Sequence, residues 1–430
     1  MGKLFINATK NYGAKITEAL DNSEGRIDGI RYSIADIPVP HANRIEMEIE
    51  WLYQFPEFPI YYLTIYNEYV DYYFNRETIN LPNGKKFTPS EKNNRLICMD
   101  EHVDFSFLKQ LPLSTMGYSI NREKIMSMIN EFYDNYYQDS YLMTPSFLLN
   151  KIGSWEDIML LDILKSTSEY LENESKDEVY LSIVLDPVLL EISDVVNNIK
   201  SYVGMYSYIK GISLTIINDK SMYIYNKNDY KNILTFIKEL KLMGLKIHLN
   251  YSGVKDIVLS CLDIERFAVG WFGSFRNFDT DSKRISELEV NSFGRRVRKI
   301  FSKRFMSEIP LDYLEVLTSQ ECQEYFNIDK DRMDSINYNN LEQQYWTTML
   351  EIIEKNDEVE NQNQGDALID ARCEMLKEIM DDAIINIERF IIKLKENGRY
   401  DDASKLEKNN LIHVKMYKEV LSEFQGKLFF

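Results

Sequence analysis

Cysteine, histidine, proline and glycine are scarce in this chain of 430 residues, and basic residues are outnumbered by acidic ones. The four cysteines stand far apart with no CxxC pair, which argues against a zinc ribbon and against a disulfide framework. Four histidines and no HExxH motif leave little basis for a histidine-based site, so we predict no metal centre. Only 17 glycines and 10 prolines beside 29 tyrosines argue against a disordered chain.

Long apolar runs are also missing. None approaches the roughly 20 residues that cross a bilayer, so we expect no membrane partner. Residues 1–6 lack the apolar core of a signal peptide, and Ile6 stands where a myristoylation signal has Ser or Thr. Together with the scattered thiols, these absences predict a cytoplasmic protein. No Walker, dinucleotide, GxSxG or kinase signature is present, so the sequence identifies no cofactor and does not establish an enzyme.

The composition that remains is that of a globular chain, with 44% apolar and 27% charged residues. Its length predicts more than one structural unit. Composition and periodicity divide it into a segment that supplies strands or a cap (1–140), a βα-repeat region (141–281), a helical region (282–358) and a helical hairpin (366–430).

Short apolar runs alternate with helical patterns in the second of these segments. The predicted strands are 141–144, 179–185, 212–217, 246–251 and 266–271. A helix is predicted over 229–243, with Gly244 as its C′ glycine. This alternation predicts right-handed βαβ crossovers and a parallel sheet, hence an α/β fold.

Polar residues interleave with apolar ones in three of these strands. The polar positions are Ser182, Ser213, Thr215, His248 and Asn250. A central strand of an open sheet, covered on both faces, is more often continuously apolar. We therefore favour a (β/α)-barrel-like region, whose interior accepts small polar groups, over an open doubly wound sheet.

Ligands of parallel α/β folds bind at the carboxyl ends of the strands. Asp186, which closes a strand directly before Pro187, is our candidate catalytic acid, base or nucleophile, with His248 and Asn250 as further candidate catalytic residues. The alternatives are structural: an Asp before Pro is often a turn former or helix cap, and His248 fits a hydrogen-bonded core histidine.

Further polar and aromatic residues follow the strand ends and are candidate ligand-binding residues: Asn218, Asp219, Tyr251, Trp271 and Arg276. The segment 270–276 contains two glycines, Ser274 and Arg276, which suggests a loop that grips phosphate. The alternative is that Trp271 belongs to the core and the asparagines only begin loops.

A basic cluster interrupts the acidic chain, whose net charge is −18. Eight basic and three acidic residues lie between Asp281 and Phe305, and apolar residues recur there at helical spacing. The cluster predicts a basic helix that binds nucleic acid or a phosphate ligand through Arg295, Arg296, Arg298, Lys299, Lys303 and Arg304. The alternative is a solvated helix that pairs with the chain's own carboxylates.

Two amphipathic patterns around Asn397-Gly398 predict an antiparallel helical hairpin at the C-terminus. Two functions follow from the sequence. The first is a barrel-type protein that binds or acts on a polar, phosphate- or nucleotide-containing ligand. The second is a non-catalytic subunit of a protein or protein–nucleic-acid assembly, which docks through the 366–430 hairpin and the basic helix.

Overall fold

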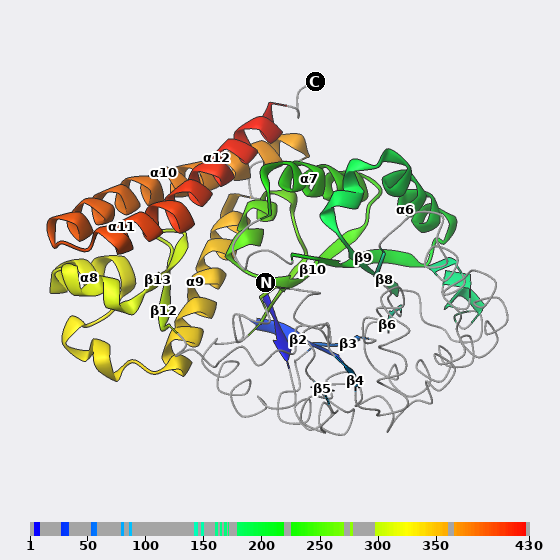
Figure 1. The fold of residues 1–430 in the computed structure, drawn as a ribbon. Coiled ribbons are helices and arrows are strands. Elements are labelled where there is room, and N and C mark those ends of the chain that lie inside the picture. The colour runs from blue at the N-terminus through cyan, green and yellow to red at the C-terminus, as the bar shows by residue number, and fades with distance from the viewer. Residues whose placement is uncertain are drawn as a thin grey trace.

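A computed structural model describes the strands and helices on which the fold depends. It covers 179–218, 225–270, 276–277, 297–359 and 365–426, and the shorter segments 4–8, 27–33, 53–57, 79–80, 86–87, 142–144 and 148–149, with some positions between 160 and 171. Figure 1 shows strands flanked by helices α6 and α7, with the helical C-terminal region beside them. No helix in these parts of the chain is long and apolar enough to span a bilayer.

Nine strands form one sheet in which every pairing is parallel. They are β1 (Leu4–Ala8), β2 (Ile27–Ser33), β3 (Tyr53–Glu57), β6 (Leu142–Met143), β7 (Leu148–Leu149), β8 (Val179–Leu185), β9 (Ile209–Ile216), β10 (Lys246–Ser252) and β11 (Arg266–Gly270). A separate two-stranded sheet joins β4 (Ile79–Asn80) to β5 (Lys86–Phe87). The predicted parallel α/β region is confirmed, and the N-terminal 140 residues contribute β1, β2 and β3 to its sheet.

The strands follow one another across the sheet in the order β3-β2-β1-β11-β10-β9-β8-β6. The first strand therefore pairs with the last, Leu4 opposite Phe267, as in a cyclic arrangement. Cα atoms of β3 and β6 approach within 8 Å, but no hydrogen-bonded ladder joins these two strands in the described segments. Closure into a barrel stays a prediction.

Helices connect the paired strands as the sequence predicts. They are the 3₁₀ helix η5 (Pro187–Glu191), α6 (Ser193–Met205), α7 (Lys227–Leu242) and the 3₁₀ helix η6 (Val254–Leu262). Helix α7 begins at Asn226, whose side chain accepts a hydrogen bond from the Asp229 amide, and Gly244 follows it with φ +81°. The C-terminal end carries the glycine that the sequence analysis used to place this helix, and the N-terminal end lies two residues before the predicted start.

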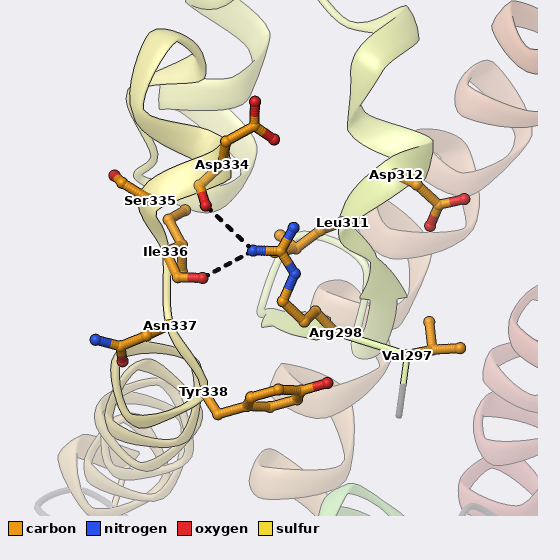
Figure 2. A pocket seen from close by; sticks show the side chains of 9 residues that line it. All are labelled: Val297, Arg298, Leu311, Asp312, Asp334, Ser335, Ile336, Asn337 and Tyr338. Carbon is orange, nitrogen blue, oxygen red and sulfur yellow. Dashed lines mark hydrogen bonds between the residues drawn. The ribbon is translucent and has the colours of Figure 1, made fainter. Parts of the chain in front are cut away.

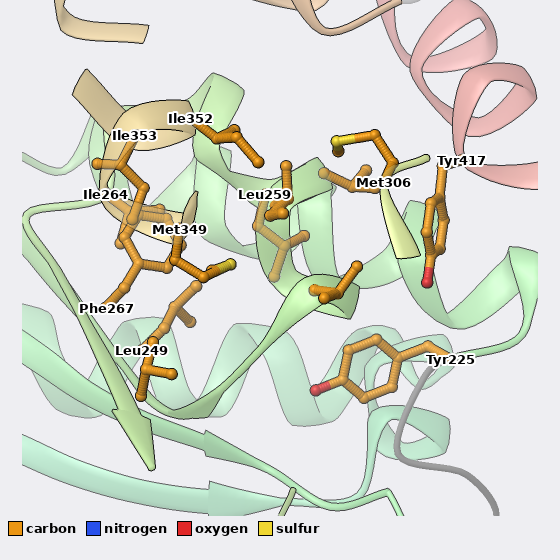
Figure 3. Close-up of a cluster of buried hydrophobic side chains, with 14 of the residues drawn as sticks. Tyr225, Leu249, Leu259, Ile264, Phe267, Met306, Met349, Ile352, Ile353 and Tyr417 are labelled. Atoms are coloured by element: carbon orange, nitrogen blue, oxygen red, sulfur yellow. The ribbon is translucent and has the colours of Figure 1, made fainter. Parts of the chain in front are cut away.

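The two faces of the sheet differ in chemistry because side chains alternate along each strand. One face is apolar, and Figure 3 shows Leu249 and Phe267 from it packed against Leu259 of η6 and Met349 of α9 (Tyr338–Glu358). The opposite face carries hydroxyl, amide and imidazole side chains. They are Ser182, Ser213, Thr215, His248 and Asn250, all buried. We call these five residues the polar face.

The C-terminal region is mostly helical. It contains η10 (Leu311–Val316), α8 (Ser319–Phe326), η11 (Lys330–Ser335), α9 (Tyr338–Glu358), α10 (Asp366–Glu396), α11 (Tyr400–Leu406), the π-helical turn η13 (Glu407–Leu411) and α12 (Ile412–Gln425). Helices α10 and α12 pack together as the predicted hairpin, and Gly398 turns the chain between α10 and α11 with φ +76°. The apolar stripe of the hairpin is buried, including Leu376, Ile387, Val414 and Leu421.

The predicted basic helix is wrong where the structure describes it. Residues 299–302 form strand β12 (Lys299–Ser302), which pairs antiparallel with β13 (Ser307–Pro310). Ile300 and Phe301 are adjacent yet both buried, because this hairpin is covered on both sides: Phe301 lies 5.0 Å from the Tyr345 ring of α9. A strand buried on both faces has no period of two, so spacing alone did not distinguish it from a helix.

The C-terminal hairpin packs on the α/β region. Tyr417 of α12 lies edge-on to Tyr230 of α7 at 5.5 Å, and Lys227 of α7 pairs with Glu423 of α12 at 2.6 Å. Every residue of η6 is buried, and α9 and α10 lie against it. Helical region and sheet therefore share one continuous core.

Candidate functional site

The polar face brings together residues from three neighbouring strands. Ser182 of β8, Ser213 of β9 and His248 of β10 lie side by side in the register of the sheet. Ser213 and Thr215 are each 1% exposed. Buried polar groups are stable only when they are hydrogen-bonded, so a face of this composition needs partners.

Asn250 supplies part of that bonding. Its Nδ2 donates to Ser213 Oγ at 2.8 Å and to Thr215 Oγ1 at 3.1 Å. Both amide protons are thereby used, and each hydroxyl keeps its own proton to donate elsewhere. The structure thus joins Asn250, a predicted catalytic residue, to two strand residues on which the barrel interpretation depends.

His248 is held against an aromatic ring. It stacks on Tyr180 with ring centroids 4.2 Å apart, and Phe5 lies 6.2 Å away. Tyr180 reaches it across Gly211, where a Cβ would come within 2.4 Å of the Tyr180 ring. The absence of a side chain at position 211 therefore makes the stack possible, and this packing agrees with the structural alternative for His248.

Asp186 lies at the carboxyl end of β8, where the sequence placed it. It is half-buried, and its Oδ1 accepts a hydrogen bond from the Val188 amide at 3.0 Å as the N-cap of η5. The capping alternative is thus realised. A catalytic role for the same carboxylate stays a prediction.

Arg276, a predicted ligand-binding residue, is buried and bonded within the protein. Its Nε donates to the carbonyl of Gly270 at 3.0 Å, its Nη1 to Glu308 at 3.2 Å and its Nη2 to Glu342. The guanidinium also lies 3.3 Å from the centroid of the Tyr345 ring. Arg276 therefore connects the end of β11 to β13 and α9.

The remaining predicted ligand residues fall into two groups. Asn218 is buried, and its carbonyl accepts a hydrogen bond from Asn277 Nδ2 at 2.7 Å. Tyr251 has a φ of +52°, an unusual conformation for a bulky side chain, and its carbonyl accepts from Lys255 Nζ at 3.1 Å. Asp219 and Trp271 lie outside the described residues.

Sequence reasoning missed a buried ion pair next to this site. Lys255 Nζ lies 2.6 Å from Asp256 Oδ2 and also donates to the carbonyl of Arg276. Burial raises the pKa of Asp256, and the neighbouring lysine charge opposes that rise. A Lys-Asp pair in an apolar helix gives no recognisable signal in the sequence, because whether the pair is buried depends on the elements that pack over the helix.

The basic cluster is largely engaged in local contacts where it is described. Figure 2 shows Arg298 donating to the carbonyls of Asp334 and Ile336, at 3.4 and 3.0 Å. Lys303 pairs with Glu351 at 2.9 Å, in agreement with the alternative of pairing to the chain's own carboxylates. Lys299 is half-buried and Arg304 is exposed. Arg295 and Arg296 lie outside the described residues.

Fold and site define a parallel α/β protein whose sheet has one apolar face and one polar face. Among the residues described here, no group of three or more His, Cys, Asp or Glu side chains is placed to hold a metal ion. Comparison with known proteins adds no family: no family model matches the chain, and no curated protein matches it significantly.

Proposed function

We propose that this protein is a (β/α)-barrel-like protein that binds or acts on a small polar ligand at the carboxyl ends of β8, β9, β10 and β11. The observation that carries the proposal is the polar face, buried opposite an apolar face covered by helices. A sheet that served only as a core would gain more stability from apolar side chains at these positions, because burying polar groups is costly. A ligand site explains their presence.

In this proposal Asn250, Ser213 and Thr215 orient the ligand. The two hydroxyls accept hydrogen bonds from Asn250, which fixes their orientation on the polar face. His248 and Asp186 are the groups able to move a proton, with His248 held in place by its stack on Tyr180.

A ligand that contains phosphate or a nucleotide would need groups that bind an anion, and the sequence suggested arginines for this role. Arg276 donates to Gly270, Glu308 and Glu342, and Arg298 donates to backbone carbonyls. Neither guanidinium is therefore offered to an anion in this structure.

The second function is docking of an assembly through the hairpin, which the sequence favours because it shows no catalytic signature. The sequence left the hairpin's apolar stripe without a known partner, and the structure buries that stripe against α7 and η6. A partner would have to recognise a different surface of the hairpin.

Native mass spectrometry of the full chain, purified without denaturation from its own host, tests the ligand proposal. We expect a bound small molecule in the wild type, its loss in Asn250→Leu, and its retention in the control Asp382→Asn, which changes an exposed carboxylate of α10. A wild-type mass equal to that of the bare chain would count against the proposal, as would equal retention by both variants.

A further inference from the structure

Two buried acceptor atoms have no donor in the described parts of the chain. They are Oδ1 of Asn277 and Oδ1 of Asp229. Asn277 is 8% exposed and Asp229 is 7% exposed. An acceptor buried without a donor is costly, so each of these atoms calls for a hydrogen-bond donor from another molecule.

The orientation of the Asn277 amide is fixed by its neighbour. Its nitrogen faces the carbonyl of Asn218 at 2.7 Å, and a carbonyl oxygen requires a donor. Turning the amide over would set two oxygens against each other. Oδ1 of Asn277 therefore points away from the Asn218 carbonyl and is an acceptor.

Asp229 lies in the first turn of α7, the helix that follows β9 in the chain. Burial raises the pKa of its carboxyl group; hydrogen bonding from Asn226 lowers it, and the charges of Asp186 and Glu191 raise it again. Helix η5, which carries Glu191 and is capped by Asp186, packs on α7. The charges of two neighbouring carboxylates thus act on the Asp229 carboxyl group at this edge of the sheet.

We propose that the carboxyl ends of β8 and β9 bind a positively charged nitrogen group, an ammonium or a guanidinium, with Asn277 and Asp229 as hydrogen-bond acceptors. Asp186 and Glu191 add the negative potential that favours a cation over a neutral donor. This inference rests on the proposed ligand site and specifies one part of the ligand, which must carry N–H donors where it meets these residues.

Three four-carbon probes test the inference on the full chain by isothermal titration calorimetry at low ionic strength. They are butane-1,4-diamine, butane-1,4-diol and succinate, which present ammonium, hydroxyl and carboxylate groups at the same spacing. We expect binding of the diamine and much weaker or no binding of the diol and of succinate. No binding of the diamine, or equal binding of diamine and diol, would overturn the inference.

The variants Asp229→Asn and Asn277→Leu locate the diamine. Each should weaken its binding by about tenfold or more, since each removes an acceptor to a charged donor. Asp382→Asn is the control for a lost carboxylate and should bind as the wild type does. Because Asp229→Asn removes a buried charge, we expect it to fold. Equal diamine affinity in Asp229→Asn and Asp382→Asn would refute the assignment.

The outcome is separable from that of the proposed function. A co-purified ligand that depends on Asn250 but carries no cationic nitrogen would leave the proposed function standing and remove this inference. If the diamine binds in a way that depends on Asp229 but the protein retains no ligand from its host, the inference stands and the proposed function loses its support.

Discussion

Replacing Arg276 with methionine should destabilise the protein rather than only weaken ligand binding. The guanidinium is 5% exposed and is bonded to two carboxylates, Glu308 and Glu342, whose side chains are 13% and 11% exposed. Without Arg276 both carboxylates stay buried with no neutralising charge from this position. Removing one partner of a buried ion pair costs about 3–5 kcal/mol, so we expect a loss of this size in the free energy of unfolding.

The destabilisation by uncompensated charge can be measured separately from that by lost packing of the Arg276 side chain. In the background of Arg276→Met, the further changes Glu308→Gln and Glu342→Gln should recover much of the lost stability, because they remove the uncompensated charges. Urea unfolding followed by circular dichroism measures the free energy of unfolding of Arg276→Met alone, with each glutamine substitution, and with both. The reasoning would be refuted if Arg276→Met unfolded within about 0.5 kcal/mol of the wild type while losing a bound ligand. That result would restore Arg276 as a ligand-binding residue.

Three further changes test the packing and the charges of the fold. Tyr417→Ala should lower the free energy of unfolding by about 3 kcal/mol in urea, since a buried aromatic ring is removed between the hairpin and α7. Lys227 and Lys231 lower the pKa of Glu423 to about 2. The ionised Glu423 therefore contributes to folding stability above the pKa that this residue has in the unfolded chain, and the contribution is lost as the pH falls from about 4.5 toward 2. The protection factors of the α12 amides, which correct for the pH dependence of intrinsic exchange, should therefore fall over that range, and Glu423→Gln should flatten the dependence. Gly211→Ala should cost about 1–3 kcal/mol in thermal unfolding, because the new Cβ would meet a tyrosine ring and a carbonyl oxygen.

The α/β region was predictable because each of its elements carries its own signal. The run 179–185 is apolar and ends at Asp186-Pro187, and the structure has β8 over the same residues. The helix predicted over 229–243 appears as Lys227–Leu242, with Gly244 after it. Local residues decide such boundaries, so one sequence suffices to place them.

The elements that depend on distant partners were not predictable. Residues 299–302 form a strand that pairs with β13 and is covered by α9, whereas their apolar spacing fits a helix equally well. In the sequence Arg276 fits a phosphate-binding residue, but in the structure it pairs with one glutamate of β13 and one of α9. Within the candidate site, the sequence shows the alternation of polar residues in β8, β9 and β10. Four other residues stand out only because the structure buries them: Lys255, Asp256, Asp229 and Asn277.

A crystal structure of the protein as purified from its own host tests the central claim most directly. The account predicts electron density for a small molecule at the carboxyl ends of β8 to β11, with polar atoms within hydrogen-bond distance of Ser213 or Thr215. Density for the chain's own side chains over the whole polar face, with any bound molecule instead in the pocket lined by Arg298, Asp334 and Tyr338, would contradict it.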